Sequence, residues 1–584
     1  MRDEGLGDGA DGLVELMLDI DISVEDGVAI ERYQRIFYYG DESAVANRHI
    51  NTIAWNPQQE DIRVLTATVL QPDQTQNKYD PSTVQINDTD SFDVFTDTRE
   101  IIIIPPKLGV GSIAILSYER KINLEQPYFF SSYIQSTSRR KNFSLRVKAT
   151  GTLPRWKVDG ELLTCTHDNN SLNCSAEEIL PVTLDDTVYY QDVAPQITIS
   201  SFNDWQQVVK IMNERIARAM ENSQRIENLF AEMSNESDYK RAAHDFVTRQ
   251  VRYVSLSQGD NATFPHHVDV TIENRYGDCK DKSTLLLALL KAKNQKAYPV
   301  LVSLERSDPN RLVLPGMGYF DHMVICTSSL RGEHCYDATD TYTDHTTIPD
   351  GIQGKVRLNL VDGSGPSTIP RNEFRWRMHA DAETVFEIDG SQTESLIRTY
   401  YGEYASFRRS QIESKSEQEK SEALVSEYQS TVSDKAQVSI TKIEASPLNN
   451  ELKISSETRF DPFFNTDEEV SYADNPFWVL VALGSFDIKN KYYDYDFPGL
   501  KLSSAYSYKL SDNLKLRDVG AEFNYATKYG EISRTYRSTG SSVTASTQLK
   551  MPAQIIAVDE KEGFNRFVQH VFNDSKIRFR MMPK

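Results

Sequence analysis

The sequence of 584 residues predicts a multidomain protein in which two β-rich regions flank a central α+β region. Short, alternating, aromatic-rich runs separated by turn signals fill residues 13–195, as expected of a β-sandwich-like domain. Helical periodicity dominates the start of residues 196–372, and short apolar strands follow it, which is an α+β layout. A period of two returns over residues 373–584, which predicts a C-terminal β-rich domain that closes with a helix.

The N-terminal region contains several candidate strands, with turn signals such as Gln-Pro-Asp-Gln and Pro-Pro-Lys-Leu-Gly between them. Such a pattern predicts a sandwich or a twisted antiparallel sheet. Trp55 and Trp156 are interpreted as core residues rather than as a binding face, because buried aromatic packing is the commoner role. The candidate strands are residues 28–39, 62–70, 101–104, 112–118 and 143–149.

The central region begins with two predicted helices. Asp204 or a neighbouring serine can cap the first, whose apolar residues recur about every 3.6 positions from residue 208 to 220. A second helix is expected over residues 239–250, and strands over 251–256 and 297–303. Residues 305–320 are rich in proline and glycine, so they predict a loop that forms the lip of a cleft.

The stretch Asn-Arg-Tyr-Gly-Asp-Cys-Lys-Asp-Lys-Ser, followed by a leucine-rich run, predicts a turn that enters a helix at Cys279. Gly277 favours a tight turn, and Asp278 is a good N-cap residue. Cys279 is therefore expected at the positive end of the helix, where free N–H groups and the helix dipole favour a thiolate. The apolar residues of this helix are Leu285, Leu286, Leu289 and Leu290.

Two short β-like runs at residues 321–327 and 334–339 predict a hairpin. His322 and Asp337 have almost the same register across it, so we expect them to lie close together. A cysteine at a helix N-terminus that faces a histidine and an aspartate on adjacent strands is the thiol form of a nucleophile–base–orienting-acid arrangement.

The runs RYGDCKDKSTLLLALLKA, FDHMVI and CYDATD resemble the transglutaminase-like core of bacterial proteins, which has a papain-like fold. In that family an uncharacterised β-domain precedes the core and a β-rich segment follows it. The resemblance extends to VRYVSLSQG and IAWNPQQEDIRVLTATVLQPD. It implies that Cys279 is the nucleophile, His322 the base and Asp337 the orienting acid. Asp321 departs from the small or polar residue common before the histidine, and its charge should favour the imidazolium.

No motif fixes the donor that would stabilise an oxyanion. Tyr253 and Gln258 are the candidates, because they lie on a predicted strand and loop that precede the cysteine. His266 and His267 are adjacent, but no second pair of His or Cys residues stands at ligand spacing, so no metal site is expected. No other cofactor is expected.

These residues predict a thiol-dependent acyl-transfer enzyme that acts on peptide or protein amides, with cell-wall peptide as one candidate substrate. Hydrolysis is favoured over cross-linking, because nothing marks a dedicated amine site. The alternative is a non-catalytic binding or assembly scaffold at the cell envelope with an inactive core. The sequence leaves the oligomeric state open.

The net charge of the chain indicates which classes of partner it can bind. The chain has 64 basic and 85 acidic residues, for a net charge of −21, which argues against nucleic acid as a partner. No run of about 18 apolar residues is present, so no membrane span is expected.

The number and spacing of the five cysteines indicate the cellular compartment in which the protein works. Cys165 and Cys174 are nine residues apart, as are Cys326 and Cys335, so each pair is a candidate hairpin disulfide that leaves Cys279 unpaired. That count is typical of an exported thiol enzyme, periplasmic or extracellular. The first twelve residues lack the features of a secretory signal, so either the chain is a trimmed form of an exported protein or it is cytoplasmic. In the cytoplasm the four cysteines would be ordinary reduced residues.

The C-terminal region is expected to contain strands at residues 393–400, 437–444, 451–460 and 500–510. A helix with a charged outer face is predicted over residues 410–432, and a closing helix over 559–574. The apolar run at residues 476–483 is of uncertain type, helix or strand.

Overall fold

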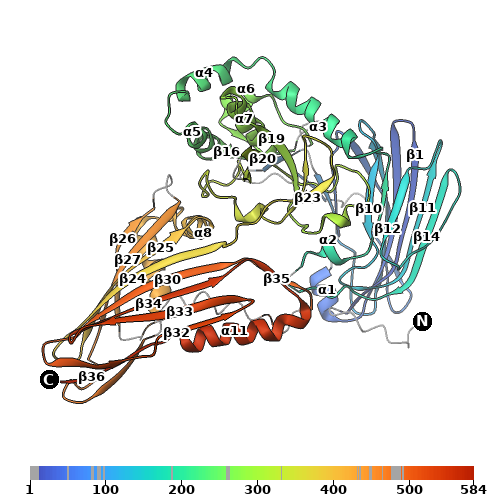
Figure 1. Cartoon of the computed structure of the whole chain (residues 1–584). Helices are drawn as coiled ribbons and strands as arrows, with labels where there is room; N and C mark the ends of the chain where they lie inside the picture. The colour runs from blue at the N-terminus through green and yellow to red at the C-terminus, as the bar shows by residue number, and fades with distance from the viewer. Residues whose placement is uncertain are drawn as a thin grey trace. The chain divides into compact units, whose positions relative to one another are not determined.

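The computed structural model describes residues 12–48, 51–79, 85–88, 94–96, 99–185, 188–257, 263–329, 332–430, 432, 436–445, 450–462, 464–474, 488 and 492–584 (Figure 1). The chain divides into two compact units. The first consists of Met1–Leu184, Val188–Thr339 and Gly354–Ile369, and the second of Asp185–Thr187, Asp340–Gln353 and Pro370–Lys584. The division into three domains at residues 195 and 372 stays a prediction.

The N-terminal part of the first unit is built on an eight-stranded sheet of order β13-β14-β11-β1-β2-β9-β4-β5. All but one of its strand pairs are antiparallel. β1 and β11 run parallel, which the predicted alternatives, a sandwich or a twisted antiparallel sheet, did not specify. The parallel pair arises because β1 is a central strand, with β2 on one side and a strand from much later in the sequence on the other. The strands are β1 (Leu13–Glu25), β2 (Val28–Tyr39), β4 (Glu60–Leu70), β5 (Gln76–Lys78), β9 (Ile113–Asn123), β11 (Arg139–Ala149), β13 (Thr164–His167) and β14 (Ser171–Ile179).

A three-stranded sheet, β10 (Phe129–Tyr133), β15 (Gln196–Ser200) and β12 (Arg155–Asp159), packs on the large sheet. The core between them is apolar and buried, and includes Ile20, Leu145 and Ile199. Trp55 is buried in a small separate cluster, and Trp156 is partly buried beside His167. The shorter elements of this part are α1 (Glu42–Arg48), α2 (Tyr190–Val193), β3 (Asn51–Trp55), β6 (Gln85–Asp88), β7 (Val94–Thr96) and β8 (Arg99–Ile103).

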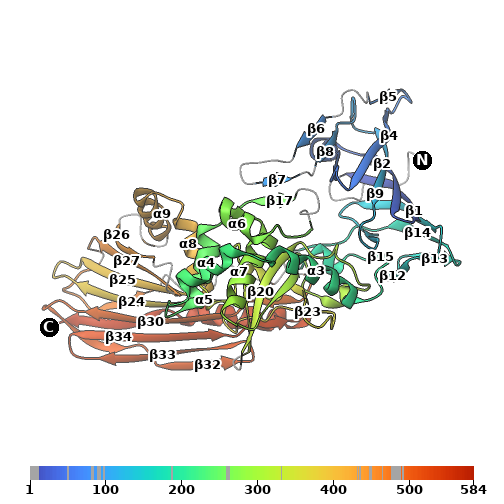
Figure 2. The same cartoon turned by 90° about the horizontal axis from the view of Figure 1, so that it is seen from above.

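The central part of the first unit places helices against a five-stranded sheet of order β21-β20-β19-β22-β23 (Figure 2). Helix α7 (Cys279–Ala292) packs on β19 (Ala297–Ser303) and β20 (His322–Ser329), and its leucines are buried in the shared core. The predicted helix over 239–250 is α5 (Tyr239–Asp245) continued by a π-helix, η2 (Phe246–Gln250). The other elements are α3 (Trp205–Met220), α4 (Gln224–Met233), β16 (Arg252–Tyr253), β17 (Ser255–Ser257), α6 (Val268–Asn274), β18 (Tyr276–Gly277), η4 (Pro309–Arg311), β21 (Gly332–Tyr336), β22 (Val356–Asn359) and β23 (Pro366–Thr368).

The second unit is an eight-stranded sheet of order β26-β27-β25-β24-β30-β34-β33-β32, with one large apolar core. Helix α11 (Lys561–Asp574) buries Phe564 and Phe567 in that core, as the closing helix was predicted to do. The strands of the sheet are β24 (Trp376–Phe386), β25 (Gln392–Tyr401), β26 (Gln437–Glu444), β27 (Glu451–Phe460), β30 (Leu500–Lys509), β32 (Phe523–Thr527), β33 (Gly530–Ser538) and β34 (Ser542–Met551). The smaller elements are η5 (Asp350–Ile352), β28 (Val470–Asp474), β29 (Tyr495–Phe497), β31 (Leu514–Val519), β35 (Gln554–Ile556), η6 (Val558–Glu560) and β36 (Ile577–Pro583).

Two predictions for the second unit are wrong in detail. The single helix over 410–432 is two helices, α8 (Glu403–Ile412) and α9 (Glu417–Gln429), because Ser416 and Glu419 form a capping box that starts a new helix. The chain also does not close with a helix, since β36 follows α11 and pairs with β28 and β31. The apolar run at 476–483 lies outside the described residues. Within the described ranges, no helix is both long and apolar enough to cross a membrane.

Candidate active site

Cys279 is the first residue of α7, as predicted, and its helix start is held by reciprocal hydrogen bonds. The Asp278 carboxylate accepts from the backbone N–H of Lys280 at 3.0 Å and of Asp281 at 3.2 Å, and the Asp281 carboxylate accepts from the N–H of Asp278 at 3.2 Å. Cys279 is half-buried and is the one free cysteine among the five, all of which the structure describes. Its thiol therefore lies at a fixed, positive helix end.

Gly277 has a different role from the predicted tight turn. It lies in β18, beside Tyr253 of β16, and a Cβ there would lie 2.7 Å from the Cβ of Asp281. The glycine therefore lets the carboxylate of Asp281 reach back over the chain that precedes Cys279.

His322 opens β20 and Asp337 follows the last residue of β21, so the predicted hairpin is present. The two side chains meet, with His322 Nε2 2.8 Å from Asp337 Oδ2. The other carboxylate oxygen, Oδ1, accepts from the backbone N–H of Thr339 at 2.9 Å and from its hydroxyl at 2.7 Å. Asp337 thus orients the imidazole and is itself held in place.

The electrostatics of this pair favour an ion pair. Burial disfavours the imidazolium, but the charge and hydrogen bond of Asp337, together with a hydrogen bond to the Cys279 thiol, raise the pKa of His322 well above its ordinary value. Burial would raise the pKa of Asp337, but His322 and the bonds from Thr339 hold it below its ordinary value. Because Nε2 bonds Asp337, Nδ1 is the nitrogen left to face the sulfur. The three groups can store a proton on the imidazole and present a thiolate.

Three polar residues near Cys279 were not among the predicted site residues. Lys282, 1% exposed, donates to the carbonyl of Val251 at 2.7 Å, and burial lowers its pKa to about 8. His266 Nδ1 lies 3.1 Å from Asp281 Oδ2, and the Asp281 hydrogen bond raises the pKa of His266. Ser283 Oγ donates to the carbonyl of Met323 at 2.7 Å, which ties α7 to the strand of His322. For Lys282 and Ser283 the signal that could have found them is a run of polar residues in the first turns of a helix that is otherwise leucine-rich.

Cys279 and His322 line one cleft of about 340 Å³. Tyr253, a predicted oxyanion donor, lies on the same cleft, and burial together with repulsion from Cys279, Asp278 and Asp337 raises its pKa to about 12. The hydroxyl therefore stays protonated and able to donate. Gln258, the other candidate, lies outside the described residues. The remaining wall has a polar part and an apolar part. The polar part is Thr263, Asp278, Lys280 and Asp321, and the apolar part is Met212, Leu301, Met317, Phe320 and Met323.

The other four cysteines form two disulfides, Cys165–Cys174 between β13 and β14 and Cys326–Cys335 between β20 and β21. The second bridge joins the two strands that carry His322 and Asp337. Within the described part of the chain, one group of metal-type donors clusters closely, namely Cys326, Glu333 and Cys335. Both of its sulfurs are used by the disulfide, so the group does not fit a metal ion.

Comparison with known proteins bears first on the N-terminal region. Residues 25–166 match the family model DUF3857, a domain of unknown function with a solved structure. No curated protein matches the chain. The matched residues run from the end of β1 to β13, so they lie within the β-rich part of the first unit.

The whole chain resembles a solved structure. A protein from Parabacteroides distasonis, described as a "putative protease", is 11% identical and has a TM-score of 0.65, covering 98% of this chain and 100% of that one. At this identity the likeness shows a shared multidomain, β-rich fold. A "putative cysteine protease" from Cytophaga hutchinsonii (13% identity, TM-score 0.19, 59% of this chain and 86% of that one) matches too weakly to support a structural argument. The same holds for an M1 zinc metallopeptidase from Deinococcus radiodurans (14% identity, TM-score 0.19, 33% and 43%).

Proposed function

We propose that this protein is a cysteine peptidase or amidase with a transglutaminase-like core, in which Cys279, His322 and Asp337 form the catalytic triad. The observation that carries the proposal is the chain of contacts from Asp337 through His322 to Cys279 at the wall of one cleft. The Parabacteroides distasonis protein, which shares the fold, is described as a "putative protease", which agrees with the proposal.

The reaction follows from these groups. The Cys279 thiolate attacks the carbonyl carbon of a peptide amide, and the His322 imidazolium gives its proton to the leaving nitrogen as the C–N bond breaks. Water then attacks the thioester while His322 takes its proton, and the bond to sulfur breaks to give the acid and the free enzyme. Tyr253 is our candidate donor to the oxyanion, since its hydroxyl lies on the cleft and keeps its proton.

A labelling experiment tests the proposal. At about pH 6 an ordinary thiol, with a pKa near 8.5, is almost wholly protonated, whereas a thiolate paired with an imidazolium is not. We expect iodoacetamide to modify Cys279 much faster than it modifies glutathione, and His322→Ala to remove the difference. His379→Gln, a histidine of the second unit, is the matched control and should leave the rate unchanged. Labelling of the wild type no faster than glutathione would favour the non-catalytic scaffold.

Substrate profiling then separates the reactions. A peptide library, including bacterial cell-wall peptides, is incubated with the wild type and with Cys279→Ala, and products are identified by mass. We expect hydrolysed peptides in the wild type alone. Incorporation of an added biotinylated primary amine in place of water would instead show amide cross-linking.

We also propose that the protein works outside the cytoplasm, in the periplasm or beyond the cell. The two disulfides support this, because such bonds persist in oxidising compartments. We expect the protein isolated from its own cells without reductant to be lighter than the reduced protein by four hydrogens, two for each of the two disulfides. Equal masses would place it in a reducing compartment.

A further inference from the structure

The segment between β19 and β20, residues 304–320, borders the cleft; we call it the lip segment. Its ends are joined, because the N–H of Leu304 donates to Asp321 Oδ1 at 2.9 Å and the N–H of Asp321 donates to the Val302 carbonyl at 3.1 Å. Met317 and Phe320 of the lip segment line the cleft together with Cys279. The position of this segment therefore decides the shape of one cleft wall.

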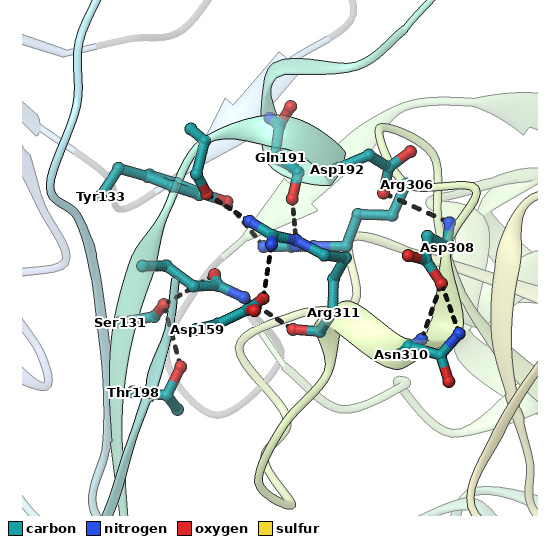
Figure 3. Close-up of polar contacts among 12 residues, drawn as sticks. Ser131, Tyr133, Asp159, Gln191, Asp192, Thr198, Arg306, Asp308, Asn310 and Arg311 are labelled. Carbon is teal, nitrogen blue, oxygen red and sulfur yellow. Dashed lines mark hydrogen bonds and ion pairs between the residues drawn. The ribbon is translucent and has the colours of Figure 1, made fainter. Parts of the chain in front are cut away.

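Two arginines tie the lip segment to the N-terminal β-rich part (Figure 3). Arg306, 5% exposed, donates to the Gln191 carbonyl at 3.0 Å and to the Tyr133 hydroxyl at 2.6 Å. Arg311 forms an ion pair with Asp159 at 2.6 Å and donates to the carbonyl of Ala194. Charge-assisted bonds of this kind, several of them sheltered from water, hold one geometry rather than many.

Backbone groups of the lip segment are held as well. The Asp192 carboxylate accepts from the N–H of Ser307 at 2.8 Å, from its hydroxyl at 2.7 Å and from the N–H of Asp308 at 3.3 Å. Gln196 donates to the carbonyl of Arg311 at 2.6 Å, and Ser200 donates to that of Pro315 at 2.6 Å. The partners come from α2 and β15, more than a hundred residues earlier in the chain.

An aromatic ring completes the attachment. Phe129 of β10 lies so close to the lip segment that a Cβ at Gly316 would be 2.1 Å from its ring and one at Gly318 2.7 Å. Its ring centroid is 4.8 Å from that of Tyr319, in an edge-on arrangement. The glycines therefore admit the ring, and the lip segment is packed from behind by the N-terminal sheet.

We propose that Arg306 and Arg311 are positioning residues that fix the lip segment on the sheet of β10, β15 and β12, so that the cleft selects peptides with a large apolar side chain beside the reacting amide. The fixed lip presents Met317 and Phe320 to the cleft, where Met212, Leu301 and Met323 extend the same apolar wall. Thioether and aromatic groups bind apolar side chains of varied shape. The inference rests on the proposed thiol acyl transfer and adds its substrate class and the role of the N-terminal part.

The test compares small and peptidyl reagents on the full chain. Iodoacetamide reports the reactivity of Cys279 alone, and two chloromethyl ketones, acetyl-alanyl-phenylalanyl and acetyl-alanyl-glycyl, report selection of the side chain beside the reacting carbonyl. In the wild type we expect the phenylalanyl reagent to react at least about tenfold faster than the glycyl one, the discrimination typical of an apolar pocket. Arg306→Met and Arg311→Met should bring the two rates close together and leave the iodoacetamide rate unchanged. Arg146→Met, which removes an ion pair of β11 with Asp19 and Asp21 that does not reach the lip segment, should behave as the wild type.

A conservative variant and a hydrogen-exchange measurement distinguish loss of the lip attachment from a failure to fold. Arg311→Lys, which retains the charge opposite Asp159, should restore part of the selectivity, and it serves if the methionine variant fails to fold. Hydrogen exchange of residues 304–320 should rise in Arg311→Met and not in Arg146→Met. Equal rates of the two ketones in the wild type, or selectivity and exchange unchanged in both lip variants, would overturn the inference. Iodoacetamide labelling of the wild type no faster than that of glutathione would instead contradict the proposed function. The hydrogen-exchange data would still show whether the two arginines fix the lip segment.

Discussion

Cys279 and Asp337 are each held in place by hydrogen bonds of neighbouring residues, and Asp337 in turn orients His322. Asp278 fixes the helix start at the cysteine, and Thr339 occupies the carboxylate oxygen of Asp337 that His322 does not use. Under the proposed mechanism, a substitution at one of these supporting residues should therefore alter the rate through the charge or direction of the imidazole or the thiol, without removing a reacting atom.

The first prediction concerns Asp337 and pH. In the wild type His322 stays protonated well above its ordinary pKa, because the attraction of Asp337 outweighs the effect of burial. In Asp337→Asn burial dominates, so the imidazolium should be lost at lower pH, and the alkaline limb of kcat/KM should move down, because the leaving nitrogen then lacks its proton donor. We expect kcat/KM to fall by about a hundredfold or more, as when a base loses its orientation and charge partner. A pH profile of kcat/KM for a peptide that the wild type hydrolyses checks the shift, and an unmoved alkaline limb would contradict it.

The helix start at Cys279 and the contact of His322 with Asp337 could be predicted from sequence because their determinants are local. A helix start at Cys279 follows from Asp278 and the leucine pattern, and the pairing of Cys326 with Cys335 sets the register that brings His322 near Asp337. The close approach of the Asp281 side chain to Gly277 was not predictable. The distance between a Cβ at Gly277 and the Cβ of Asp281 depends on how β16 and β18 pair.

At the scale of elements, α7 is joined to the π-helix η2 and to β16 by one buried charge. Lys282, one turn after the cysteine, donates to the carbonyl of Val251, which directly precedes β16 and its cleft residue Tyr253. The hydrogen bond from Lys282 thus connects α7, the helix of Cys279, to β16, the strand that carries the candidate oxyanion donor Tyr253.

We predict that Lys282→Met lowers the free energy of unfolding by about 1–3 kcal/mol, because the buried carbonyl of Val251 loses its donor. Activity should fall as well, since β16 loses its tie to α7. Lys291→Met, an exposed lysine of the same helix, is the control and should change stability by no more than about 0.5 kcal/mol. Chemical denaturation with urea measures both variants, and equal stabilities would contradict the role of Lys282.

Element types were predictable where the hydrophobic period was long, and less so at their ends. The π-helix at the end of α5 has no period of its own over five residues, so it could not be told from an α-helix. The break between α8 and α9 did carry a signal, the Ser416 and Glu419 capping box, which the helical pattern on both sides concealed.

At the scale of the whole molecule, each of the two compact units buries polar side chains within its β-rich structure. In the second unit Glu394 is buried and accepts from the Tyr428 hydroxyl at 2.5 Å. Burial, together with repulsion from Asp474, raises the pKa of Glu394 to about 7. The carboxyl therefore titrates in the physiological range.

This gives a prediction for stability. A raised carboxyl pKa means that the folded protein holds a proton that the unfolded chain releases, so stability should fall as pH rises from about 4.5 to about 7, by up to about 3 kcal/mol. In Glu394→Gln that part of the slope should vanish, whereas Glu531→Gln, an exposed residue of β33, should keep it. Calorimetric unfolding at several pH values measures the slope, and parallel curves for the wild type and Glu394→Gln would count against the assignment.

The β-rich character of both end regions and the helices between them were predictable from the change of period along the chain. The attachment of the lip segment was not, because Arg306 and Arg311 find partners more than a hundred residues away and no local pattern marks such contacts. The parallel pairing of β1 with β11 was not predictable either, because the two strands lie more than a hundred residues apart in the sequence.

That parallel pairing has a consequence for biosynthesis. Glu15 of β1 bonds Arg140 of β11, 125 residues later, and in the second unit His379 of β24 contacts Ser503 of the parallel strand β30, 124 residues later. At roughly 5–20 residues per second, a ribosome needs on the order of ten seconds to deliver the missing neighbour, and during that time a central strand has one open edge. Nascent chains halted before residue 139 or before residue 500 should therefore bind chaperones at the open edge of β1 or β24, and that edge should be covered in chains halted after the partner strand has emerged.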